Sequence, residues 1–292
     1  MARSAENERI GTEEYLSVTN SRKAIMGQYA GLLDPAPMKA KAAAEAELRK
    51  AVAANPEWQK TVGDAWDKIA AAAEARKAWH VRHSLLSRGV SGDLFNTART
   101  LVMMADELPK PAAERLREFG DAALPNLKLR LFSPAPIHDA LEKLAVSSNL
   151  SLMAEMLGGD DPLVKKLLAG KSPTDRAAEL VNGSKLKDVA FRKKLAEGGR
   201  DAVDSADDTM ITFAKLLDSD YRAARKVAED TFDAVEREAY ARISRARFAI
   251  EGDSTYPDAT GTLRMSYGAV KGFNDDGTPV PAFTTIGGMF ER

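Results

Sequence analysis

Hydrophobic positions recur at intervals of three and four over roughly the first 250 residues, which is the period of an amphipathic helix. Alanine is abundant in these segments, and glycine and proline fall mostly between them, as intrinsic helix preference favours. The pattern therefore predicts a succession of helices. They cover residues 12–33, 38–54, 55–88, 91–105, 133–156, 161–170, a segment that opens at 172, 184–198 and 219–250.

Helix starts are marked by polar capping residues, in several cases with proline in the first turn. Asn55, Asp161 and Ser172 each precede a proline, and this combination is typical of a capped helix start. Ser91 and Ser184 are predicted to cap two further helices in the same way.

Large apolar residues indicate which helix faces are buried. Trp58, Val62 and Trp66 follow one another at spacings of four, and residues 38–88 are predicted to form one long antiparallel pair of helices. On the last long helix, Phe232 and Phe248 are candidate core residues.

The pattern changes after Gly252. Thr262–Val270 alternates between apolar and polar residues, as a half-buried strand does, and a second extended stretch covers Val280–Ile286. Between them, Asn274-Asp275-Asp276-Gly277 is a strong turn signal. Two strands alone are marginally stable in water, so the sequence predicts a sheet that further strands complete. We accordingly divide the chain into a helical domain, 1–256, and an incomplete β-barrel segment, 257–292.

Composition and charge narrow the function classes. The 292 residues include 42 basic and 43 acidic side chains, closely interspersed, for a net charge of −1. A basic excess on one face is typical of nucleic-acid binding, and its absence argues against a nucleic-acid partner. No apolar run approaches the length of a membrane span, and the first residues lack the apolar stretch of a secretory signal. There is no cysteine, so disulfides and thiolate chemistry are excluded.

Motifs that carry chemistry are scarce. His80 and His83 lie three apart and could share a helix face, but no zincin motif accompanies them, and His138 is expected in the first turns of a helix. No glycine-flanked GxSxG serine occurs. We therefore predict no catalytic residue, no metal ligand and no cofactor. From the residues alone, the chain is a helical domain with a fragment of sheet, and an independent helical binding or scaffold module stays open.

A set of segments, in order along nearly the whole chain, resembles serine peptidase family 46, the bacterial dipeptidyl peptidases of types 7 and 11. The Tyr-Pro-Asp-Ala-Thr block is the most specific of them, while Gly261 and Thr209 depart from the family's usual residues. The segments are Asn20–Lys23 with Gly27-Gln28 and Gly31-Leu32, Ser172–Ala177, Lys185–Lys193, Asp208–Ile211, Ala246–Gly252, Tyr256–Thr260, Thr262–Gly268 and Phe283–Gly288.

The resemblance implies a fold and an activity. The fold is mostly α here: a multi-helix domain inserted in a chymotrypsin-like double β-barrel, followed by the first strands of the second barrel. The family's catalytic triad lies on both sides of this region, so the chain would be an internal, inactive portion of a serine dipeptidyl aminopeptidase. The parent would release dipeptides from peptides with a free N-terminus, form a homodimer, and be periplasmic or secreted.

The resemblance also implies one binding residue. In the family an asparagine of the helical domain helps to hold the substrate's amino terminus, and Asn20 matches it within an Asn-x-x-Lys pattern on the first helix. An asparagine within a helix is not favoured by propensity, and its amide oxygen can accept a hydrogen bond from an ammonium group. Asn20 is therefore the predicted substrate-binding residue.

Overall fold

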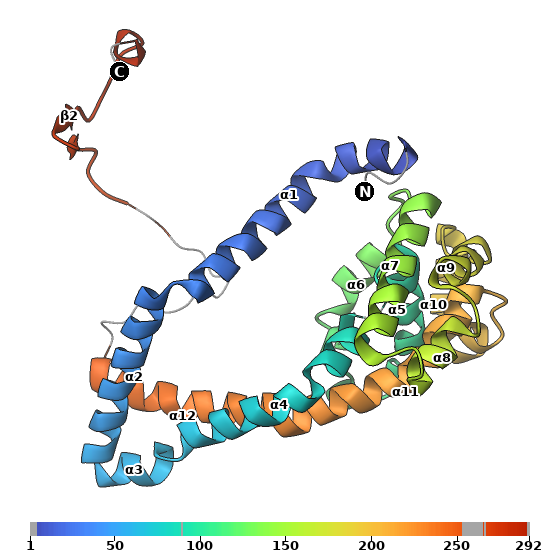
Figure 1. Cartoon of the computed structure of the whole chain (residues 1–292), viewed down its shortest axis with the longest axis horizontal. Helices are drawn as coiled ribbons and strands as arrows, with labels where there is room; N and C mark the ends of the chain where they lie inside the picture. The colour runs from blue at the N-terminus through green and yellow to red at the C-terminus, as the bar shows by residue number, and fades with distance from the viewer. Residues whose placement is uncertain (1–4, 89, 253–264, 266, 291–292) are drawn as a thin grey trace. The chain divides into compact units, whose positions relative to one another are not determined.

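The computed structural model describes residues 5–88, 90–252, 265 and 267–290. The chain divides into two compact units, Met1–Ile250 and Glu251–Arg292. The first unit is helical, and the second contains a short antiparallel pair of strands (Figure 1). The prediction of a mostly α chain with a short C-terminal β segment is confirmed. The predicted domain boundary after residue 256 lies outside the described residues and stays a prediction.

The helices follow one another closely along the chain. In order they are α1 (Ala5–Leu33), α2 (Pro35–Ala54), α3 (Pro56–Val62), α4 (Ala65–Arg88), α5 (Asp93–Glu107), η1 (Ala112–Glu114), η2 (Arg117–Phe119), α6 (Leu124–Leu131), α7 (Asp139–Leu157), α8 (Pro162–Leu168), α9 (Pro173–Asn182), α10 (Val189–Asp204), α11 (Thr209–Ala228), the π-helical turn η3 (Glu229–Asp233) and α12 (Ala234–Glu251).

Two separate hydrophobic cores hold the helical unit. The larger core is built by α5, by α7 to α11 and by the C-terminal end of α4, and it contains Phe95 and Phe213 in edge-to-face contact at 5.9 Å between ring centroids. The smaller core joins α2, α3, the start of α4 and α12 around Val52 and Trp66. Between them, α4 runs alongside α11 and η3 (Figure 1).

The predicted antiparallel pair over residues 38–88 is wrong. The chain turns at Gly63 and Asp64, so that α3 and α4 are separate helices, and the main partners of α4 are α11 and η3 instead of α2. The turn lets Val62 and Trp66 both enter the smaller core. Phe248, a predicted core residue, is 55% exposed, whereas Phe232 is buried as expected.

The predicted starts of α5 and α7 are also wrong. Ser91 does not cap α5: its N-cap is Gly92, which makes no side-chain cap and has φ +145°. Helix α7 begins at Asp139 instead of residue 133. The prolines that follow Ser133 and Ala135 disfavour helical backbone at the residue before each of them, which explains the later start.

The N-terminus of α5 is capped by a residue from another helix. Glu142 of α7 accepts hydrogen bonds from the backbone N–H groups of Asp93, at 2.8 Å, and Leu94, at 3.0 Å. A Cβ on Gly92 would lie 2.7 Å from Oε2 of Glu142, so only glycine permits this approach. Glu142 is buried, and its carboxylate replaces the serine cap that the sequence pattern suggested.

Similar corrections apply to α10 and α11. Helix α10 begins at Val189, capped by Asp188, and Ser184 instead donates to the buried carboxylate of Asp208. Asp208 caps α11, which therefore starts ten residues before the predicted position at Ser219. The sequence predicts that α10 ends at residue 198, but the helix continues to Asp204. Gly199, with φ +60°, produces a kink within it.

Several local predictions are confirmed. Asn55, Asp161 and Ser172 accept from the first backbone N–H groups of α3, α8 and α9 respectively. Each helix has proline in its first turn, as predicted.

The second unit contains a β-hairpin whose turn has two residues. Strands β1 (Phe273–Asp275) and β2 (Thr278–Val280) pair antiparallel, and Asp276 and Gly277 form the turn with φ +45° and +90°. Positive φ at both positions is the geometry that matches the twist of a hairpin, so the predicted turn is confirmed. The second predicted strand, over 280–286, is wrong, because β2 ends at Val280 and residues 281–286 form no strand. Of the strand predicted over 262–270, residues 267–270 form no strand, and 262–264 and 266 lie outside the described residues.

The cap provided by Glu142 leads to a stability prediction. Glu142→Ala removes the acceptor of two backbone donors and leaves both without a partner near the larger core. We expect the free energy of unfolding to fall by about 2 kcal/mol, and Tm by about 4–8 °C. Thermal unfolding followed by circular dichroism measures the change.

Glu155→Ala is the matched control, because Glu155 lies exposed on the same helix. Its effect should stay within about 0.5 kcal/mol. Equal effects of the two substitutions would show that the cap contributes nothing.

Candidate functional site

Asn20, the predicted substrate-binding residue, lies on α1, and its side chain is exposed. Within the described residues it has no hydrogen-bond partner, so its amide is available to a ligand. Lys23, the other defined member of the Asn-x-x-Lys pattern, is exposed as well. The structure therefore leaves Asn20 accessible, and it does not bring any other predicted site residue to it.

The helix that carries Asn20 also exposes large apolar side chains. Ile25 is 64% exposed, Tyr29 59% and Leu32 70%, and their spacing of four and three residues places them on one face. Isolated exposed apolar residues are ordinary on a protein surface, whereas a row of them on one helix is typical of an interaction surface. We call Ile25, Tyr29 and Leu32 the α1 apolar face.

His80 and His83 lie on one face of α4. Both line one cavity of about 300 Å³ beside Phe232 and Asp233, which confirms that they share a face. In the described part of the chain, no group of three or more His, Asp or Glu side chains could hold a metal ion. His138 is the N-cap residue of α7 and makes no side-chain cap, instead of lying within the first turns.

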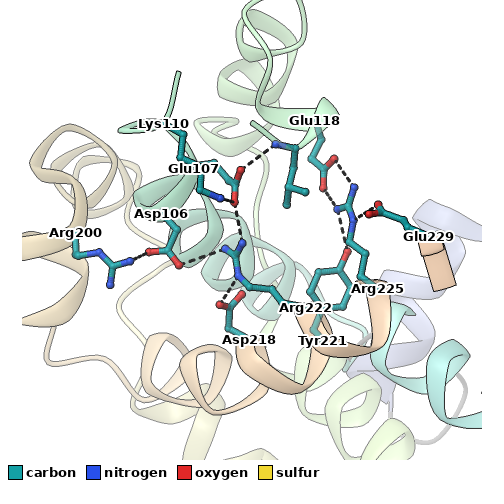
Figure 2. Close-up of polar contacts among 11 residues, drawn as sticks. Asp106, Glu107, Lys110, Glu118, Arg200, Asp218, Tyr221, Arg222, Arg225 and Glu229 are labelled. Atoms are coloured by element: carbon teal, nitrogen blue, oxygen red, sulfur yellow. Dashed lines mark hydrogen bonds and ion pairs between the residues drawn. The ribbon is translucent and has the colours of Figure 1, made fainter. Parts of the chain in front are cut away.

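The densest cluster of charges joins α5, α10 and α11 (Figure 2). The guanidinium of Arg222 donates to Glu107 at 2.8 Å and to Asp218 at 2.7 Å, and it also contacts Asp106. Asp106 in turn pairs with Arg200 of α10. The cluster thus bridges three helices of the larger core at one edge.

A second arginine extends the cluster along α11. Arg225 pairs with Glu118 of η2 and with Glu229 at the start of η3 (Figure 2). These hydrogen bonds raise the pKa of Arg225, although burial acts in the opposite direction. Each cation drawn in Figure 2 faces a carboxylate. The arrangement is that of a structural ion-pair network, because every carboxylate in it is already engaged by a cation.

Glu107 is the most buried member of this cluster. Its side chain is fully buried, and it accepts hydrogen bonds from Lys110, Arg222 and the backbone N–H of Leu116. Burial alone would raise the pKa of Glu107, but these donors outweigh it and lower the pKa from 4.5 to about 2. Glu107 is therefore ionised at neutral pH.

The adjacent residues Asp207 and Asp208 differ in burial and in role. Asp207 is exposed and pairs with Lys185, whereas the neighbouring Asp208 is buried. Asp208 accepts from the backbone N–H groups of Lys185, Met210 and Ile211. Its carboxylate is therefore the buried cap of α11.

A cavity of about 550 Å³ was also missed by the sequence analysis. It lies between α5, α6, residues 133–137 and α10, and we call it the α5–α6 cavity. Its polar lining on α5 comes from Asp93, Asn96, Thr97 and Thr100. The spacing of these four positions places them on one face of α5. A polar face on an otherwise apolar helix is the sequence signal that could have indicated this cavity.

A family model described as Peptidase S46 matches residues 1–292. Among the described residues, no helix has an apolar stretch that is long enough to cross a membrane.

The low pKa of Glu107 leads to a pH prediction. A carboxyl with a pKa of about 2 when folded and 4.5 when unfolded contributes roughly 3 kcal/mol to stability at neutral pH. This contribution is complete above pH 4.5 and is lost as the pH falls towards 2. Glu107→Gln should therefore be strongly destabilised at pH 7, and the difference from the natural sequence should shrink steadily below pH 4.5.

Urea unfolding of both proteins across this pH range measures the difference. Glu114→Gln serves as the control, because Glu114 is exposed on η1 and should give a small difference at every pH. A constant loss of stability in Glu107→Gln from pH 7 to pH 2 would contradict the assignment of the shift to the ionised form.

Proposed function

The chain belongs to the serine peptidase family S46, and we propose that it forms the helical, non-catalytic portion of a dipeptidyl aminopeptidase. In this proposal the helical unit covers the active-site cleft of the parent enzyme. The observation that carries it is the exposure of α1: the side chain of Asn20 has no hydrogen-bond partner among the described residues, and the α1 apolar face, on a different side of the helix, is exposed as well. An accessible amide on an exposed helix suits a cleft in which a peptide is bound.

The chemistry of the parent fits a chain without a nucleophile. A serine outside the segments described above would attack the carbonyl carbon of the substrate's second residue, and its proton would pass to a histidine. The leaving peptide takes that proton, and water then releases the dipeptide from the acyl-enzyme. The helical portion has no proton to transfer in these steps. Its contribution is steric, because closing the cleft beyond the second subsite limits the product to dipeptides.

Asn20 would supply the one polar contact to the substrate. Its amide oxygen can accept a hydrogen bond from the ammonium group of a free amino terminus, which carries a positive charge at neutral pH. A hydrogen bond to a charged group is stronger than one between neutral groups. Asn20 therefore favours substrates with an unblocked amino terminus.

The hairpin of the second unit supports the same proposal. Each of its strands has three residues, and almost all of their side chains are exposed. A hairpin of this size is marginally stable by itself. In the parent enzyme, β1 and β2 would join further strands of the second barrel. The parent would act on peptide substrates as a homodimer, in the periplasm or outside the cell.

Substitution of Asn20 tests the binding role. In the full-length enzyme, Asn20→Ala removes the acceptor for the substrate ammonium group, and we expect kcat/KM for a fluorogenic dipeptide to fall about tenfold or more. The loss should appear mainly in KM, because the contact is made before and during the chemical step alike. Steady-state kinetics with a free dipeptidyl substrate measures both constants.

Asn126→Ala is the matched control, since Asn126 is an exposed amide on α6. Its kinetic constants should equal those of the unsubstituted enzyme. The 292-residue chain alone should show no turnover. Unchanged kinetics in Asn20→Ala would remove the binding role, and turnover by the isolated chain would remove the non-catalytic assignment.

A further inference from the structure

The α5–α6 cavity has the dimensions of a small-molecule site. Its volume is about 550 Å³, and pockets that bind small ligands typically have about 300–1,000 Å³. The lining from α5 is polar, and Leu127, Leu131 and Ile137 add apolar side chains. A ligand that fits it has charged or polar groups on one side and an apolar body.

Polar side chains on these walls are not used by the fold. Within the described residues, Asp93, Asn96, Thr97 and Arg130 have no hydrogen bond or ion pair through their side chains, although all four line the cavity. In the cluster of Figure 2, by contrast, each guanidinium group is paired with at least one carboxylate. The cavity thus holds charges that a ligand can still engage.

Two arginines, Arg130 and Arg192, line the cavity. Arg192 is 3% exposed and donates to the carbonyl oxygens of Leu131, at 2.7 Å, and Ser133, at 3.1 Å. Arg130 precedes Leu131 in sequence and also lines the cavity. The buried guanidinium of Arg192 has no carboxylate partner in the part of the chain described, and its Nε has no hydrogen-bond partner. The carboxylate of Asp188 acts on Arg192 only through its electrostatic field, without a direct contact, so the guanidinium still favours an incoming anion.

Anionic groups gather at the start of α5. Asp93 is exposed at the cavity wall, and its backbone N–H is held at 2.8 Å from Oε1 of Glu142. Two carboxyl groups therefore lie near this wall, one of them free of any side-chain partner in the described structure. This wall favours a cation, so the cavity as a whole does not suit a simple anion.

Because unpartnered side chains of both charges line this cavity, we propose that the α5–α6 cavity binds a small zwitterion, a dipeptide or an amino acid with a free ammonium and a free carboxylate group. The ammonium group contacts Asp93, and the carboxylate contacts Arg130 in the field of Arg192. The amide of Asn96 and the hydroxyl of Thr97 hydrogen-bond to the ligand's backbone, and apolar side chains rest against Leu127 and Ile137. The inference is independent of the proposed peptidase function.

Calorimetric titration of the full chain with leucyl-leucine tests the proposal. The free dipeptide should bind saturably at one site. Its N-acetyl and its C-amide derivatives each lack one charge, and each should bind at least about tenfold more weakly, because a hydrogen bond to a charged group is lost. Equal binding of the three compounds, or no binding of leucyl-leucine, would overturn the proposal.

Two substitutions locate the site. Asp93→Asn and Arg130→Gln alter exposed side chains, and each should weaken leucyl-leucine binding about tenfold or more. Asp67→Asn, in the first turn of α4, and Lys128→Gln, on α6, are the matched exposed controls and should leave binding unchanged.

The pattern across the ligands separates the two ends. Asp93→Asn should abolish the preference for the free amine over the N-acetyl form, and Arg130→Gln should abolish the preference for the free acid over the amide. Binding that both variants leave intact would place the dipeptide elsewhere and refute the assignment. Catalytic activity enters none of these measurements, so their outcome is separate from that of the Asn20 test.

Discussion

Two helices of the larger core begin where protein surrounds their first backbone N–H groups, and buried carboxylates are the acceptors that make these starts possible. Glu142 serves α5 and Asp208 serves α11. An unsatisfied buried donor costs about 1–3 kcal/mol, so each acceptor stabilises its helix start at the observed position. Because α10 and α11 both contact α5, the position of one helix start determines that of its neighbours.

Local signals in the sequence predicted local structure well. Asn55, Asp161 and Ser172 cap the helices that follow them, and the turn at Asp276 and Gly277 forms the hairpin. In each case the residues that determine the conformation are adjacent in sequence. The mostly helical character followed in the same way from the spacing of apolar residues.

Contacts between distant residues explain the errors. Glu142 lies about fifty residues after the helix start that it caps, and nothing near Ser91 reveals it. Ser184 has the properties of a cap but is engaged by Asp208. The turn between α3 and α4 depends on a core shared with α12. Periodicity alone could not distinguish such a turn from a continuous helix.

The same distinction between local and distant residues applies to the two candidate sites. Asn20 could be named from the sequence because a single family pattern carries it, and the structure shows that its side chain is accessible. The α5–α6 cavity could not, since Asp93, Arg130 and Arg192 lie far apart in sequence. Residues that resemble the family also recur at Ser172 and Asp208, where they cap helices. Part of the resemblance is therefore a requirement of the fold.

The presence of two cores has a consequence for α4, which belongs to both. Trp66 at its beginning is buried in the smaller core, and Leu86 near its end is buried in the larger one. Parts of a protein open to solvent with different free energies, and fewer buried contacts lower the free energy of opening. Backbone hydrogens near Trp66 can exchange with solvent when the smaller core opens alone, while those near Leu86 exchange only when the larger core opens. The single continuous helix α4 is thus divided between two cooperative units. The backbone hydrogen bonds at its two ends open at different rates, although their pattern is the same along the helix.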